Sequence, residues 1–196
     1  MPRACRDWVD GGVYHVFSRG SNRQAIFLNE GDYVEFDVLL GEALRRFGME
    51  CFAWSLMPNH WHALVRGGRI SELMKHVNHR YALRFNRRWG RTAHVFENRF
   101  GAVLQESDEQ FLWTIRYIVR NPVEAGLAAS VHDARWTSFR ATAGLERAPS
   151  HLAVAGVLSS FGTADLEIGR RRFIDFVDGD EAGRNEPAEG WLPRAA

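Results

Sequence analysis

The chain has 196 residues, of which 45% are hydrophobic and 25% charged, and its formal net charge is +1. This composition is typical of a globular protein that can bury a core, and no apolar run reaches the roughly 20 residues of a membrane span. The N-terminus lacks the apolar stretch of a secretory signal and the two cysteines, Cys5 and Cys51, have no motif spacing, so we expect a cytoplasmic protein with no membrane partner, disulfide framework or zinc knuckle.

Strands and helices are predicted to interleave along the first two thirds of the chain. Alternating or continuous apolar residues predict strands over residues 12–20, 50–56 and 60–65 and an extended segment over 93–105. Apolar residues at helical spacing predict helices over 30–47, 71–89 and 108–121. Without a strict βαβ repeat, this order favours an α+β fold, an antiparallel sheet with helices packed on it.

After about residue 136 the pattern becomes weaker. An apolar run over 152–161 and a helix over 164–177 predict a partly helical C-terminal extension. The residues from 178 to 196 are rich in Gly, Pro and acid, and we expect them to be loose. We therefore divide the chain into a main domain, 1–140, and an extension, 141–196.

The small net charge hides an uneven distribution. Residues 66–120 contain eleven Arg and Lys against five Asp and Glu, a balance of +6, whereas residues 148–196 contain five against eight, a balance of −3. A basic middle segment is a candidate for contact with a polyanion, although exposed helices are also often rich in arginine.

Two histidines flank a tryptophan in the predicted strand over 60–65. Because side chains alternate along a strand, His60 and His62 project to one face and Trp61 to the other. Two neighbouring imidazoles can clamp a metal ion, since neutral histidine is a frequent metal ligand. The spacing alone leaves open whether this pair binds metal or is incidental.

A tyrosine and an asparagine share one face of the predicted helix over 108–121. The apolar residues of this helix form the face that we expect to meet the core, and Tyr117 is expected to project away from it. Asn121 follows one turn later on the same face as Tyr117, and Gln110 and Thr114 lie earlier on this polar face. Such a pair suits a nucleophile beside a metal ligand, but it also suits a half-exposed tyrosine and a helix-ending asparagine before Pro122.

Several blocks of the sequence together resemble the REP-associated tyrosine transposases, a family of single-tyrosine transposases with the HUH motif (His–hydrophobic–His). The segment 58–62, Pro-Asn-His-Trp-His, resembles the HUH motif, and the segment 116–127 resembles the tyrosine helix of that family. Three further blocks fit in the expected order, and together they cover residues 13 to about 140: these are 14–23, 81–88 and 95–100.

The resemblance implies a ferredoxin-like sheet with the two histidines on a central strand. It also implies that His60, His62 and Asn121 bind a divalent metal and that Tyr117 attacks DNA to form a 5′-phosphotyrosine. Imidazole and amide ligands suit Mn²⁺ or a partly hydrated Mg²⁺, although Zn²⁺ is also possible. The expected activity is cleavage and rejoining of single-stranded DNA near hairpins, by a monomer or a homodimer.

The expected DNA contacts are basic residues of three segments. Arginine offers a planar fork to phosphates, and Phe85, Trp89 and Phe96 offer rings on which bases can stack, unless these rings belong to the core. The candidates for DNA binding are Arg19, Arg23, Lys75, Arg80, Arg84, Arg87, Arg88 and Arg99.

Two other functions remain open from the sequence. A domesticated protein of the same fold would bind hairpin DNA without mobilising it. A metal-binding protein unrelated to DNA would carry the histidine pair for another purpose.

Overall fold

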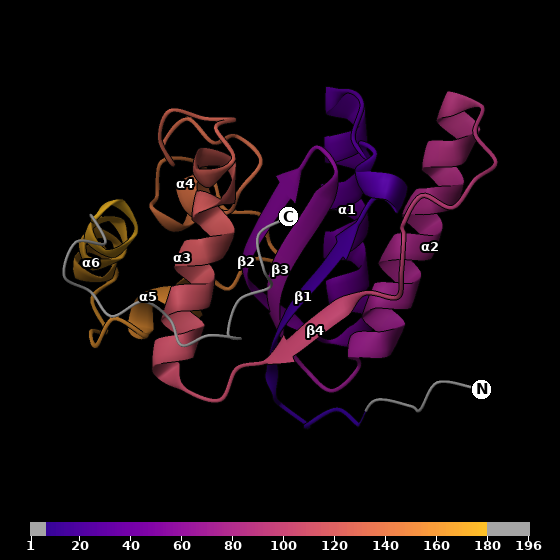
Figure 1. The fold of residues 1–196 in the computed structure, drawn as a ribbon. Helices are drawn as coiled ribbons and strands as arrows, with labels where there is room; N and C mark the ends of the chain where they lie inside the picture. Colours follow the sequence, from indigo (N-terminus) through magenta and orange to yellow (C-terminus); the bar gives the residue numbers. More distant parts are fainter. Residues whose placement is uncertain (1–6, 180–196) are drawn as a thin grey trace.

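A four-stranded antiparallel sheet forms the centre of the computed structural model, which describes residues 7–179 (Figure 1). Its strands lie in the order β2-β3-β1-β4, and every neighbouring pair is antiparallel. With helices α1 and α2 between them, the strands follow the βαββαβ order of ferredoxin-like folds, so the predicted α+β fold class is confirmed. The strands are β1 (Val13–Arg19), β2 (Glu50–Met57), β3 (His60–Arg66) and β4 (Gly101–Leu104).

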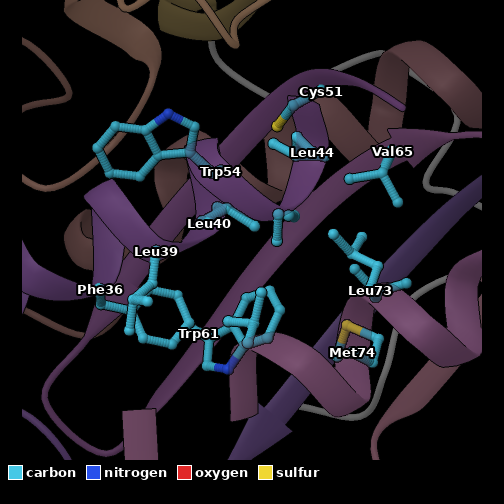
Figure 2. Packing of buried hydrophobic residues seen from close by; sticks show 14 of the residues in the cluster. Phe36, Leu39, Leu40, Leu44, Cys51, Trp54, Trp61, Val65, Leu73 and Met74 are labelled. Carbon is cyan, nitrogen blue, oxygen red and sulfur yellow. The ribbon is translucent and has the colours of Figure 1, made fainter. Parts of the chain in front are cut away.

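Helices α1 (Glu30–Phe47) and α2 (Ile70–Trp89) cover one face of the sheet. The α1 helix begins at a capping box, in which Asn29 and Asp32 each accept a hydrogen bond from the other's backbone amide, and it ends at left-handed Gly48. Between these helices and the sheet lies the larger apolar core, which Figure 2 shows from close by. Trp61 is fully buried there, so its side of β3 faces α1 and α2.

The opposite face of the sheet carries helix α3 (Asp108–Glu124), and three further helices pack beside it. These are α4 (Phe139–Thr142), α5 (Val154–Ser159) and α6 (Leu166–Asp178). A second core of buried residues joins the sheet to α3 and to the later helices, and it includes Phe52 and Leu64 of the sheet, Ile118 of α3 and Phe173 of α6. The sheet is therefore covered on both faces.

Two sequence predictions differ from the structure in detail, and one short element was missed. The extended segment over 93–105 forms a strand only at β4, and residues 93–100 run irregularly with one bridge between Phe96 and Gly20. Helix α3 continues past Pro122 to Glu124, because the carbonyls of Asn121 and Pro122 still accept bonds from Ala125 and Leu127. A short 3₁₀ turn, η1 (Ser21–Arg23), follows β1 and was not predicted.

The predicted helix over 164–177 is present as α6, whereas most of the tail predicted to be loose, residues 180–196, lies outside the described residues. The boundary at residue 140 stays a prediction. Within residues 7–179, no helix has both the length and the apolar character that crossing a membrane requires.

Candidate active site

The two histidines of β3 lie on the face of the sheet that α3 covers. In the β1–β3 ladder His60 stands opposite Arg19 and His62 stands opposite Phe17. Directly opposed residues share a face, so these four side chains belong to one surface above the strands. The rings of His60 and His62 are 5.0 Å apart and nearly perpendicular.

Helix α3 brings Tyr117 and Asn121 to the same place. The Tyr117 ring lies 5.6 Å from the His62 ring, edge to face. One turn further along, Asn121 Oδ1 lies 3.3 Å from His60 Nε2. His60 and Asn121, which are 61 positions apart in the sequence, therefore meet in one chain, on two elements that pack directly against each other.

The tyrosine is less exposed than the helical pattern predicted. Tyr117 was expected to project away from the core. Instead it is half-buried and packs against the second core, over the sheet. Gln110 and Thr114, expected on the same polar face, are buried. They bond to the segment before α3, where Thr114 donates to the Gln105 side chain and Gln110 accepts from the Glu106 amide. This helix is covered on two sides, which a single apolar face does not predict.

A third histidine, His15 of β1, belongs to the site and was missed in the sequence. It is fully buried, and its Nε2 lies 2.9 Å from Nδ1 of His62. Its ring also lies 5.8 Å from that of Tyr117. The only sequence signal was its place on a predicted strand, since the partner depends on how β1 pairs with β3.

Burial shapes the protonation of the site. It lowers the pKa of His15 to about 3 and lowers the pKa of His62 well below the usual value of 6.5, helped there by the charges of His15, His60 and Arg19. Burial also lowers the pKa of His60; the hydrogen bond that the protonated ring would donate to Asn121 acts against this effect, and the charge of Arg19 acts with it. All three rings are thus neutral at neutral pH, which is the form that binds metal.

The phenol of Tyr117 is held in its protonated form. Burial raises its pKa above the usual 10, whereas the hydrogen bond with Asn121 and the positive charge of Arg19 lower it. The positive charge of Arg19 lowers the pKa of His60, of His62 and of Tyr117, so this basic side chain belongs to the surroundings of the site.

The donor set fits a small divalent cation. Two ligand atoms bound to one such ion are roughly 3 Å apart, close to the 3.3 Å between His60 Nε2 and Asn121 Oδ1. No hydrogen bond to another described residue occupies Nε2 of His62. Within residues 7–179 no three His, Cys, Asp or Glu side chains are grouped to hold a metal, so the amide of Asn121 is needed to complete a set of three.

The predicted DNA-contacting residues fall into two groups. Arg19, Arg23 and Arg99 belong to segments that meet at the end of β1, because the 93–100 segment runs along Arg19 and Gly20. The other five lie on α2, across the sheet from the histidines, and all are exposed: Lys75, Arg80, Arg84, Arg87 and Arg88.

Two of the α2 arginines are engaged within the chain. Arg84 pairs with Glu35, and Arg88 pairs with Glu35 and with the buried carboxylate of Asp32. The rings proposed for base stacking differ as well: Phe85 is buried in the core, Phe96 packs against it, and Trp89 is partly exposed while its indole donates to Asp32.

Comparisons with known proteins bear on the family and the fold of the chain. Residues 9–125, more than half of the chain, match the family described as "Transposase IS200 like". A search of curated proteins finds no match.

Among solved structures, one of a REP-associated tyrosine transposase bound to a REP hairpin superposes with a TM-score of 0.62. The match has 20% sequence identity and covers 78% of this chain and 92% of that one, so it establishes a shared fold. A candidate transposase of Deinococcus radiodurans R1 is 17% identical, with 59% of this chain and 95% of that chain covered at a TM-score of 0.43.

Proposed function

Because this chain belongs to the family of IS200-like transposases, we propose that it cleaves and rejoins single-stranded DNA through a covalent bond to Tyr117. The observation that carries the proposal is the meeting of four side chains above the sheet. His60 and His62 come from β3, and Tyr117 and Asn121 come from α3. A phenol beside three convergent metal-binding donors is the combination that an attack on a phosphodiester needs.

His60, His62 and Asn121 are the residues that would hold the metal, with Mg²⁺ or Mn²⁺ the ions best suited to nitrogen and amide-oxygen donors. When bound, the ion supplies positive charge that offsets the negative charge developing on the scissile phosphate. The chain itself contributes orientation. Asn121 contacts both His60 and Tyr117, so one amide links the nucleophile to the metal ligands.

The covalent step exchanges one phosphodiester bond for another. The Tyr117 phenol loses its proton to solvent and its Oη attacks phosphorus, while the bond from phosphorus to the 3′ oxygen breaks. That oxygen leaves as a 3′-OH after taking up a proton, and the 5′-phosphate stays on Tyr117. A later attack by a 3′-OH reverses the exchange, so the rejoining step needs no nucleotide cofactor.

Arg19 is proposed to assist this step. It stands beside His60 in the sheet and its charge lowers the pKa of Tyr117, which burial otherwise raises. A guanidinium near the attacking oxygen and the phosphate favours the anionic form of both. Arg23 and Arg99 are exposed on the segments that meet at this end of β1, and they would contact DNA next to the cleaved bond.

The substrate is proposed to be a single strand next to a hairpin. The similar solved structure holds a REP hairpin, and the shared fold together with exposed arginines at the end of β1 supports the same class of DNA here. Contacts from the α2 arginines would come from the other face of the sheet, as a second region of backbone binding.

The test is covalent capture. Purified protein with Mn²⁺ and a hairpin-bearing single strand should give a protein–DNA adduct that survives denaturation. Tyr117→Phe should abolish the adduct while leaving DNA binding within a few-fold. Tyr33→Phe, which removes a hydroxyl from a stacked tyrosine of α1 on the other side of the sheet, serves as the matched control.

Three outcomes would change the conclusion. An adduct in Tyr117→Phe would remove Tyr117 as the nucleophile. Unchanged cleavage in His60→Ala would remove that residue as a ligand. Hairpin binding by the wild type with no adduct under any divalent metal would instead favour a domesticated binding protein.

A further inference from the structure

We propose that Asn59 is a positioning residue that holds His60 in the one neutral tautomer able to bind a cation. The inference rests on the proposed function only in assigning His60 as a ligand. A neutral imidazole carries its proton on Nδ1 or on Nε2, and the nitrogen without the proton is the one that binds metal. Whatever fixes the proton on one nitrogen therefore decides whether the other is available.

The orientation of the Asn59 amide is set by the backbone beside it. Its Nδ2 lies 3.2 Å from the carbonyl oxygen of Arg23, which can only accept, so the NH₂ group must face that carbonyl. The amide oxygen then faces His60, with Oδ1 2.6 Å from Nδ1. A rotated amide would put two oxygens against each other at the Arg23 carbonyl.

This contact places the proton of His60. Because Oδ1 of Asn59 can only accept, Nδ1 of His60 must donate, and Nε2 keeps its lone pair. Nε2 faces Oδ1 of Asn121 at 3.3 Å. The opposite tautomer would satisfy Asn121 but would put two acceptors together at the shorter 2.6 Å contact with Asn59, so the shorter distance decides.

The lone pairs of His60 Nε2 and Asn121 Oδ1 then point at the same space with no proton between them. The amide of Asn121 is turned with its oxygen toward His60, since it is Oδ1 that lies 3.3 Å from Nε2. Two acceptors facing each other need a cation between them, and the arrangement is prepared for one.

The loop that holds Asn59 is itself under backbone strain. Asn22 and Arg23 both have left-handed conformations, with φ of 51° and 57°. Side chains other than glycine adopt this region at a cost, which surrounding contacts must offset. The contacts here run to the β2–β3 turn: the Gly20 amide donates to the Asn59 carbonyl at 2.7 Å, and the amides of Ile26 and Phe27 donate to Pro58.

The tautomer of His62 is not fixed in this way. Its Nδ1 faces Nε2 of His15, and an imidazole nitrogen can either donate or accept. The tautomer of His62 is therefore free to follow the cation, whereas that of His60 is set before the cation arrives. The two ligands of β3 differ in this respect although they look alike in the sequence.

The decisive measurement is the tautomer of His60 in the metal-free protein, read from ¹⁵N chemical shifts of the imidazole nitrogens at one fixed pH. The wild type should show Nδ1–H. Asn59→Leu removes the acceptor, and His60 should change to Nε2–H, donating to Asn121. Asn59→Asp keeps an acceptor beside Nδ1 and should keep the Nδ1–H form.

Calorimetric titration with Mn²⁺ gives a second readout. Affinity should fall about 10- to 100-fold in Asn59→Leu, the usual effect of losing a partner behind a metal-bound histidine, and should be retained in Asn59→Asp. Both variants lose the NH₂ donor to Arg23, so a role limited to stabilising the loop would weaken them equally.

Equal losses in the two variants, or an Nε2–H signal for His60 in the wild type, would overturn the proposal. If the wild type shows the Nδ1–H form of His60 but does not cleave DNA, the result counts against the proposed function alone, since the metal-free spectrum does not depend on cleavage.

Discussion

The three histidines of the site are buried to different degrees and bonded to different partners. His15 is the most buried, and its Nδ1 has no hydrogen-bond partner among residues 7–179. A buried polar nitrogen without a partner costs free energy in the folded state. Nε2 of the same ring contacts His62, so His15 costs some stability while it orients a proposed metal ligand.

This arrangement predicts a loss of stability in acid. Burial lowers the folded pKa of His15 to about 3, and the unfolded side chain has a pKa of about 6.5. Between these pH values the unfolded chain binds a proton at His15 and the folded chain does not. The contribution of neutral His15 to the free energy of unfolding is therefore fully present above about pH 6.5 and falls as the pH falls toward 3. The slope from one such group is about 1.4 kcal/mol per pH unit.

Replacing His15→Gln should remove this slope. Urea denaturation at pH 7, 6, 5 and 4.5 should show the free energy of unfolding of the variant falling less steeply, by about 1.4 kcal/mol per pH unit below pH 6. His79→Gln, at an exposed histidine of α2, is the control and should follow the wild type. Parallel curves for His15→Gln and the wild type would show that His15 is not held neutral by burial.

At the scale of elements, the loop after β1 connects backbone geometry to the site. Gly20 approaches the chain so closely that a Cβ atom would lie 2.1 Å from the Gln24 carbonyl oxygen. The contact is with backbone, which cannot rotate away, so the loop of residues 20–24 must move. The same loop holds the Asn59 side chain and backbone.

Gly20→Ala should therefore weaken both the fold and the site. We expect a loss of about 1–3 kcal/mol in unfolding free energy, the usual cost of forcing extra atoms into a packed region, together with weaker Mn²⁺ binding. Gly68→Ala is the matched control, since its Cβ would lie 3.2 Å from a carboxylate oxygen of Asp10 and 3.8 Å from the nearest backbone atom, the Cα of Asp10. Unaltered Mn²⁺ affinity in Gly20→Ala would separate the loop from the metal ligands.

Most of the strands and helices could be predicted from the sequence because their apolar patterns are local. The alternation in β3 was enough to put His60 and His62 on one face and Trp61 on the other. The spacing of four residues between Tyr117 and Asn121 was enough to pair them on α3. In each case one element holds all the information needed.

What could not be predicted depends on how separate elements pair. The role of His15 requires the β1–β3 register, which brings it beside His62. The ion pairs of Arg84 and Arg88 require the rotation of α2 against α1, which turns them toward Glu35 and Asp32. From the sequence, both arginines were counted as available to bind DNA. In the structure, part of their charge is neutralised by ion pairs within the chain.

At the scale of the whole molecule, the C-terminal helices complete the layer that positions α3. Arg116 and Arg120 of α3 donate to carbonyls at the end of α6, at Phe176, Val177 and Gly179. Phe173 of α6 is fully buried against Phe139. The tyrosine helix is thus held between the sheet and α6, and its position depends on both.

Phe173→Ala should destabilise the protein by about 3–5 kcal/mol, because it removes a fully buried aromatic side chain and leaves a cavity. Urea denaturation measures the change. Ile168→Ala, on the same helix but 37% exposed, should cost much less. A small effect at Phe173 would mean that α6 contributes little to the fold around α3.

The site draws all of its residues from one chain, which makes a prediction about how copies cooperate. His60 Nε2 and Asn121 Oδ1 are 3.3 Å apart within a single molecule, so no partner is needed to complete the set. A mixture of His60→Ala and Tyr117→Phe should then form no covalent adduct with hairpin DNA, because each copy lacks one part of its own site.

If copies instead exchanged α3, some sites in the mixture would pair an intact histidine face with an intact tyrosine. Adduct formation would then return in the mixture, and the yield would rise with protein concentration as copies associate. As a control, each variant is mixed with the wild type. If every site is self-contained, the adduct yield should equal that of the wild-type protein in the mixture, with no inhibition by the variant.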